Sequence, residues 1–226
     1  MAKKLNYNIP NGATFALASG FGAETNVTSI SNATEAVVKL TAADATIKAG
    51  DFVQIFSAWT NLDAYVAKVK SVDATANTVT LAEVDTSNTD IFPAGGGAGT
   101  IRRISGWTDL PYITTIANAG NEQQTTSFQA IQMEQARNLN TFKSAASQTF
   151  TMTHNATDPI RKTLEALDAS QDITAYKMYN KNSKETRVYG CQVSFNTLPA
   201  TAVNEVETCQ LVLNLQSKMK IYSAAA

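Results

Sequence analysis

The fold is decided by residues 148–179, which read QTFTMTHNATDPIRKTLEALDASQDITAYKMY. The segment Gln148–His154 alternates threonines with larger side chains, a pattern typical of a strand. Asp158 and Pro159 then mark the start of a helix, because Asp caps free N–H groups and proline needs none at the first helical position. The apolar stripe of this helix, at i, i+4 and i+7, comprises Ile160, Leu164 and Leu167. The stretch predicts strand, helix and strand, with the helix packed on a sheet.

The flanking residues extend this sheet. Thr186–Asn196 and Val206–Leu215 each place apolar side chains on one face, which predicts two further strands. Upstream, Leu110–Ile116 and Thr125–Met133 predict an extended hairpin, joined by the polar loop Ala117–Gln124. The polar stretch 134–147 then separates this hairpin from the strand–helix–strand unit.

Residues 35–105 have a different character. Short strand candidates recur at even intervals between turn-forming segments: Ala36–Leu40, Phe52–Ser57, Ala64–Lys70, Thr78–Ala82 and Thr100–Ile104. Regular short strands with turns predict a small closed barrel of SH3-like size. Residues 1–34 are rich in small and polar residues and contain one short strand candidate, so we interpret them as an arm that pairs with the main sheet or with a neighbouring subunit.

The sequence therefore predicts a mainly β fold in three parts. Residues 1–34 form an N-terminal arm and a strand that joins the core. Residues 35–105 form a small inserted SH3-like β-barrel. Residues 106–226 form the core, a β-sandwich or barrel with one flanking α-helix.

Composition excludes several classes of protein. Hydrophobic residues make up 44% of the chain and charged residues 16%, with a net charge of −1, so nothing indicates an electrostatic surface for gripping nucleic acid. The start Met1–Lys4 is basic, but the next residues are too polar for a signal peptide. No run approaches the ~20 apolar residues of a membrane span. We expect a soluble protein made in the cytoplasm, without a membrane partner.

The sequence offers almost no catalytic chemistry. His154 is the only histidine and has no metal-ligand spacing around it, so we interpret it as a strand-end residue with local hydrogen bonds. Cys191 and Cys209 lie on apolar strand faces and are expected to be buried thiols. The glycine run 95–99 lacks the Lys-Ser/Thr of a phosphate-binding loop and is interpreted as a flexible turn. We predict no catalytic, cofactor-binding or metal-binding residue, no cofactor and no enzymatic activity.

The order of the segments resembles the major tail tube proteins of long-tailed, siphovirus-type bacteriophages. The resemblance rests on stretches spread over most of the chain: Ala16–Ala23, Thr28–Val38, Gly50–Val53, Ser57–Trp59, Asp85–Ser87, Phe92–Gly99, Trp107–Leu110, Gly120–Gln124, Gln148–Tyr179, Val193–Asn196 and Asn204–Val206. No single motif is diagnostic; the order and spacing carry the likeness.

The resemblance implies a function and partners. It implies a tail-tube-like core that assembles as hexameric rings stacked into a hollow tube, the conduit for DNA ejection into the host. The implied partners are further copies of the chain and the tape measure, tail terminator and distal tail proteins, while viral DNA passes without specific binding. The expected location is the virion, after synthesis in the host cytoplasm. Ring-to-ring contacts are expected from 117–124 and 1–34, with 35–105 outside the tube.

Two alternatives stay open on the sequence. Another virion component, such as a tail terminator or a capsid decoration protein, could use similar β modules. A carbohydrate-binding β module could stack sugars on aromatic side chains, for which the candidates are Tyr176, Tyr179 and Tyr189.

Overall fold

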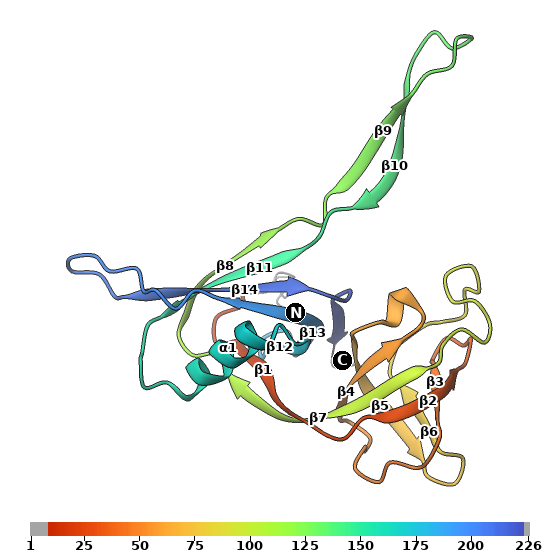
Figure 1. Cartoon of the computed structure of the whole chain (residues 1–226), viewed down its shortest axis with the longest axis horizontal. Helices are drawn as coiled ribbons and strands as arrows, with labels where there is room; N and C mark the ends of the chain where they lie inside the picture. The colour runs from red at the N-terminus through yellow and green to blue at the C-terminus, as the bar shows by residue number, and fades with distance from the viewer. Residues whose placement is uncertain (1–8, 224–226) are drawn as a thin grey trace, which may run out of the picture.

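The computed structural model describes residues 9–223, and within them the chain is mainly β with one α-helix, as the sequence predicts (Figure 1). The strands are β1 Thr14–Phe21, β2 Thr25–Ile30, β3 Val37–Leu40, β4 Phe52–Ser57, β5 Tyr65–Asp73, β6 Thr78–Leu81, β7 Gly99–Asp109, β8 Ile113–Ala119, β9 Gln123–Phe128, β10 Arg137–Lys143, β11 Ser147–Thr153, β12 Thr174–Asn180, β13 Glu185–Phe195, β14 Thr208–Leu215 and β15 Lys220–Ser223. The helical segments are the 3₁₀ turn η1 Thr60–Leu62 and the helix α1 Pro159–Ser170.

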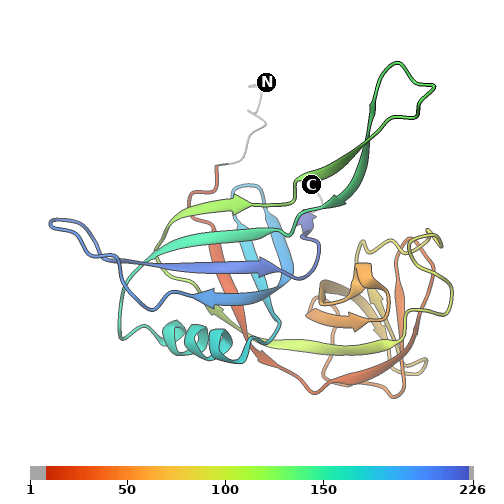
Figure 2. The ribbon, with the colours of Figure 1, turned by 45° about the horizontal axis from the view of Figure 1, so that its top comes forward.

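The core is a curved antiparallel sheet with the strand order β7-β1-β12-β13-β14-β11-β8 (Figure 2). Alternate residues of these strands face one apolar cluster, as expected for a sheet with one buried side. Its fully buried members include Leu17, Phe150, Tyr176, Tyr189, Cys191, Leu211 and Leu213. Burial of this cluster is the main source of stability for the core.

The helix α1 begins where the sequence predicts. The Asp158 carboxylate accepts a hydrogen bond of 3.4 Å from the Ile160 N–H, and Pro159 occupies the first helical position. Ile160 and Leu164 are buried in the core cluster. The Asp168 carboxylate also accepts a hydrogen bond of 3.1 Å from the Phe195 N–H of β13. The helix therefore packs on the sheet, which confirms the prediction.

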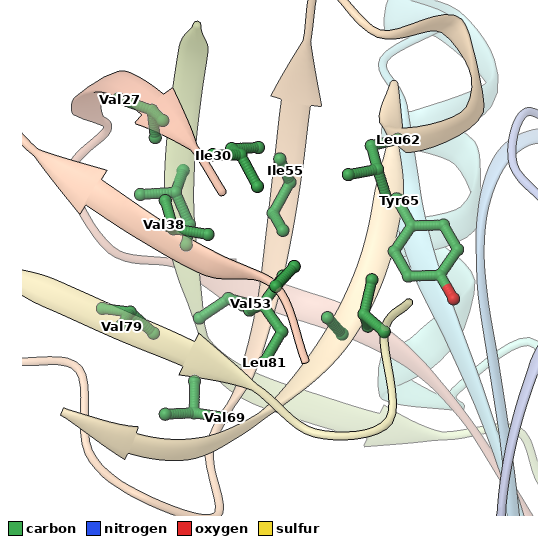
Figure 3. Packing of buried hydrophobic residues seen from close by; sticks show 14 of the residues in the cluster. Val27, Ile30, Val38, Val53, Ile55, Leu62, Tyr65, Val69, Val79 and Leu81 are labelled. Carbon is green, nitrogen blue, oxygen red and sulfur yellow. The ribbon is translucent and has the colours of Figure 1, made fainter. Parts of the chain in front are cut away.

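Residues 25–104 contribute a closed six-stranded barrel with the order β2-β3-β6-β5-β4-β7, closed by pairing of β2 with β7. Figure 3 shows its interior, where labelled side chains from β2, β3, β4, β5, β6 and η1 gather. The fully enclosed members include Val38, Val53, Ile55, Ala67, Val79, Leu81 and Ile101. The sequence predicted the small barrel but only five of its strands. It missed β2, because TNVTSI buries only Val27 and Ile30, too few for an alternating pattern.

The barrel is fixed to the core by a buried polar contact. The Arg102 guanidinium donates to the Gln54 side-chain oxygen at 2.7 Å and to the Ile173 carbonyl at 2.9 Å. The Gln54 amide, fully buried, donates to the Thr174 carbonyl at 3.2 Å. Burial lowers the pKa of Arg102. The Glu24 carboxylate, 3.7 Å from the Arg102 guanidinium, opposes that shift. Since every buried group here has a partner, the contact orients the barrel relative to β12.

The last strand holds the same junction from the other side. The Tyr222 hydroxyl accepts a hydrogen bond of 2.9 Å from the Lys68 N–H, and its ring packs edge-on against Phe52. At Gly190 the two parts come so close that a Cβ would lie 2.1 Å from the Ala64 carbonyl oxygen. Only glycine allows this approach. The short strand β15 was not predicted from the sequence.

The predicted hairpin of Leu110–Ile116 with Thr125–Met133 is wrong. β8 pairs instead with β11, and β9 pairs with β10, which lies inside the polar stretch 134–147 where no strand was predicted. The reason is that β10 has no buried residue. Sequence periodicity reports burial on one face, so a strand that is exposed on both faces leaves no such signal.

The division into 1–34, 35–105 and 106–226 stays a prediction. Residues 1–8 of the predicted arm lie outside the described residues. Within 9–34, β1 pairs with β7 and β12 in the core sheet, and β2 pairs inside the barrel. The strand β7 runs through residue 105, from the barrel into the core sheet.

Candidate assembly surface

The histidine and the cysteines form no reactive centre. His154 follows β11, and its Nδ1 lies 3.1 Å from an Arg161 guanidinium nitrogen and 3.4 Å from the Cys209 sulfur. The adjoining cavity is only about 10 Å³. Cys191 is fully buried, and burial raises the pKa of its thiol, which therefore stays protonated and unreactive. Between residues 9 and 223, no three metal-ligating side chains gather.

The tyrosines do not form a platform for sugars. Tyr176 and Tyr189 are buried in the core with ring centroids 4.7 Å apart. Burial raises the pKa of both hydroxyls above the ordinary value. Tyr179 lies three residues from Tyr176 along β12 and is 40% exposed, on the opposite face of the strand. The three rings cannot contact one ligand together.

The glycine run packs closely against the Trp59 side chain. A Cβ on Gly96 would lie 2.7 Å from the Trp59 indole nitrogen, and one on Gly97 would lie 3.0 Å from the same ring. The Trp59 indole N–H donates to the Pro93 carbonyl at 2.9 Å. The run therefore lets the chain close over Trp59, and it offers no cradle for phosphate.

The exposed apolar side chains concentrate instead on two projections from the core. The first projection comprises residues 120–146 with the hairpin β9–β10 (Figure 1). We call it the arm; it is distinct from the N-terminal arm predicted for residues 1–34. Its large exposed apolar residues are Phe128, Ile131, Leu139 and Phe142. The second, which we call the tip loop, comprises residues 196–207 between β13 and β14. It exposes Leu198, Val203 and Val206. Apolar groups gathered on projections are typical of surfaces that bind another chain.

The base of the arm is tightly specified. Gly120 and Asn121 have φ of +77° and +61°, the left-handed region. A Cβ on Gly120 would lie 1.7 Å from the Ala145 carbonyl oxygen, so the two segments at the base of the arm are in direct contact here. Ser144 donates its N–H to the Glu122 carbonyl at 2.9 Å. The direction of the arm is therefore set by its own backbone.

The arm has an apolar face and no core. Thr126 pairs with Leu139, and Phe128 pairs with Arg137. Directly opposed residues point to the same side, so Phe128 and Leu139 share one face. They are 54% and 50% exposed. An isolated two-stranded hairpin is only marginally stable in water. A face of this kind gains its stability when another chain covers it.

The core sheet also ends in an open edge. Among the described residues, β8 pairs only with β11, and nothing pairs with its other side. Its sequence, ITTIANA, carries no charge and no proline. Edge strands in monomeric proteins usually carry such groups, because they prevent pairing with other chains. The edge of β8 is therefore suited to add a strand from a neighbouring subunit.

Comparison with known proteins agrees with this reading. The model of a protein family described as phage tail tube protein (TTP) matches residues 57–224, more than half of the chain. The chain belongs to the phage tail tube protein family. A search of curated proteins gave no match. A chain in the cryo-EM structure of the anti-feeding prophage (AFP) baseplate, 6-fold symmetrised, aligns with 53% of this chain and 85% of its own. At 12% identity and a TM-score of 0.36, that likeness adds nothing to the assignment.

Family membership settles the broad function. The protein is a structural component of the phage tail, and therefore of the virion, and it assembles with other tail proteins; it is not an enzyme. Within residues 9–223, no helix is both long and apolar enough to cross a membrane. The sequence indicated this family through the order and spacing of its segments, but it did not locate the exposed apolar residues of the arm.

Proposed function

We propose that the protein polymerises as stacked hexameric rings into the tail tube of a siphovirus-type phage, and that this tube is the conduit for DNA ejection. The observation that carries the proposal is the arm, a rigidly based hairpin with an exposed apolar face, in a member of the tail tube family. Such a face requires a covering chain. A protein that polymerises supplies that chain from its own copies.

Each projection then has a role. The arm, which contains most of the predicted contact loop 117–124, contacts the adjacent ring. The edge of β8 pairs with a strand of the next subunit within the ring, since closing a ring removes open edges. The tape measure protein lies inside the tube, and the tail terminator and distal tail proteins bind its two ends.

Passage of DNA is consistent with the charge of the chain. The net charge is −1, and 18 basic residues are balanced by 19 acidic ones. A wall rich in Lys and Arg would bind phosphates and slow the DNA. We propose that the bore contacts DNA without specific binding.

We also propose that the barrel lies outside the tube. Asp90 is exposed in a barrel loop, and Cys191 and Cys209 are both buried, so Asp90→Cys introduces one reactive thiol. If the barrel is external, a bulky maleimide reacts with assembled tubes as fast as with free subunits. Protection by more than tenfold on assembly contradicts the external position.

Electron microscopy of negatively stained purified protein tests the main proposal. Long hollow filaments with sixfold averaged rings support it. Single rings that never stack indicate a terminator. A stable monomer that binds a glycan array indicates the carbohydrate module, which the burial of Tyr176 and Tyr189 disfavours.

A further inference from the structure

A large groove lies at the base of the arm. It has a volume of about 910 Å³ and is formed by η1 of the barrel, the two segments at the arm base and the segment after β14. Among the described residues that line it, three are basic and none is acidic; the basic ones are Lys143, Arg187 and Lys218. Arg187 is already paired with Glu185. Lys143 and Lys218 have no ion-pair partner within residues 9–223. The groove is therefore a positively charged hollow with apolar patches such as Leu215 and Met219.

The tip loop has complementary properties. Residues 196–207 contain two carboxylates, Glu205 and Glu207, and no basic residue. Leu198, Val203 and Val206 are 77%, 89% and 71% exposed. The loop therefore combines negative charge with apolar side chains that residues 9–223 leave exposed.

The tip loop is also held in one shape. Ala200 and Thr208 exchange backbone hydrogen bonds of 2.8 and 3.2 Å, which continue the β13–β14 hairpin outward. The Thr201 hydroxyl donates to the Glu207 carboxylate at 2.9 Å. Asn204, with φ of +61°, makes the turn at its end. A preformed loop loses little conformational entropy on binding, which favours a docking element.

The two features lie at opposite ends of one strand. The tip loop ends directly before the first residue of β14, Thr208, and the last residue of β14, Leu215, lines the groove. A strand of this length spans roughly 24 Å, and Figures 1 and 2 show the tip projecting away from the arm base and the barrel. A subunit cannot place its own tip in its own groove.

We propose that the tip loop of one subunit docks in the groove of a second copy of the chain. The inference rests on the proposed function, because a contact between opposite ends of a subunit is head-to-tail, and such contacts form a ring when their rotation closes. Glu205 and Glu207 face Lys143 and Lys218, and Val203 and Val206 cover the apolar patches. Opposite charges fix the register of such a contact and exclude wrong partners.

Charge reversal tests the pairing. In a tip variant, Glu205→Lys/Glu207→Lys, and in a groove variant, Lys143→Glu/Lys218→Glu, like charges meet at every interface. Each variant alone is expected to form at least tenfold fewer rings than the native chain. An equimolar mixture restores assembly, because subunits alternating around an even-numbered ring meet opposite charges at each contact. Asp85→Lys/Asp90→Lys, which changes the net charge as the tip variant does but on exposed barrel residues, leaves assembly unaltered. Variants that assemble normally, or a mixture that stays unassembled, overturn the proposal.

A cross-linking test does not depend on tubes. Val203→Cys in one preparation and Ala145→Cys, exposed at the groove, in another are mixed and oxidised. A disulfide-linked dimer is expected in the mixture, whereas Val203→Cys with Asp90→Cys gives none; the native thiols are buried. If microscopy shows tubes but no cross-link forms, the docking is wrong and the proposed function stands. If the cross-link forms without rings, the docking stands and the ring proposal fails.

Discussion

The barrel and the arm are both built from paired strands, but the barrel is closed around a buried interior and the arm is an open hairpin. In the barrel, pairing of β2 with β7 closes the sheet, so every strand has two neighbours and the apolar residues face inward. In the arm, β9 and β10 have one neighbour each, and none of their residues is buried. Closure removes edges that would recruit other chains. The difference shows that the barrel buries its apolar residues within the subunit, whereas the arm leaves its own exposed.

This comparison predicts that substitutions in the barrel change folding, whereas substitutions in the arm change assembly. The largest effect on folding is expected at Ile101, which is fully buried near the start of β7 and pairs with Thr25 of β2 and Ile55 of β4. Ile101→Ala lowers the free energy of unfolding of the unassembled subunit by about 2–5 kcal/mol, through lost burial and the cavity left behind.

Urea unfolding measures this loss. The matched control is Ile91→Ala, which removes the same atoms from a barrel residue that is 47% exposed and is expected to change stability by less than about 0.5 kcal/mol. If the two substitutions cost the same, the barrel interior is not the source of its stability.

A smaller effect is expected where the barrel meets the core. Arg102→Met removes the donor to the buried Gln54 oxygen and leaves that acceptor unsatisfied. Such a loss costs about 1–3 kcal/mol. Arg103→Met, on the same strand, removes an ion pair of 2.7 Å with Asp51 that is partly exposed, and pairs of that kind contribute about 0–1 kcal/mol. Equal effects of the two substitutions, again by urea unfolding, contradict the role of the junction.

The helix cap comes next in size. Asp158→Ala removes the acceptor for the Ile160 N–H and is expected to cost about 1 kcal/mol. Asp158→Ser retains an acceptor and stays within a few tenths of a kcal/mol of the native chain. Thermal unfolding followed by circular dichroism compares them, and both variants are expected to assemble normally. Loss of assembly in Asp158→Ala alone places the helix in an interface instead.

The same division explains what the sequence could predict. The helix was located because Asp158, Pro159 and the stripe through Ile160 and Leu164 all indicate one element. The barrel strands were located because closure forces one face inward, as at Val53 and Ile55. Both features are predictable because their apolar residues are buried within one subunit.

The strand β10 and its pairing with β9 were not predicted, for the same reason. The residues Arg137–Lys143 show no alternation of buried and exposed positions, because both faces of β10 are exposed in the subunit. Phe128 and Leu139 stand singly among polar residues, so neither suggests a surface until the register of β9 with β10 brings them to one face. The periodicity of a sequence reports burial within one subunit, so it does not mark residues that the subunit leaves exposed.

The smallest effect on folding, and the sharpest test of the comparison, is therefore expected in the arm. Phe128→Ser/Leu139→Ser changes the free energy of unfolding by less than about 0.5 kcal/mol, because both side chains are already half in water. The same double substitution reduces tube formation at least tenfold in sedimentation and microscopy. Thr125→Ala/Asn140→Ala alters a cross-strand pair on the other face of the arm and is expected to preserve tubes. If the apolar pair destabilises the free subunit as much as Ile101→Ala does, the arm has a packed core of its own and its contrast with the barrel fails.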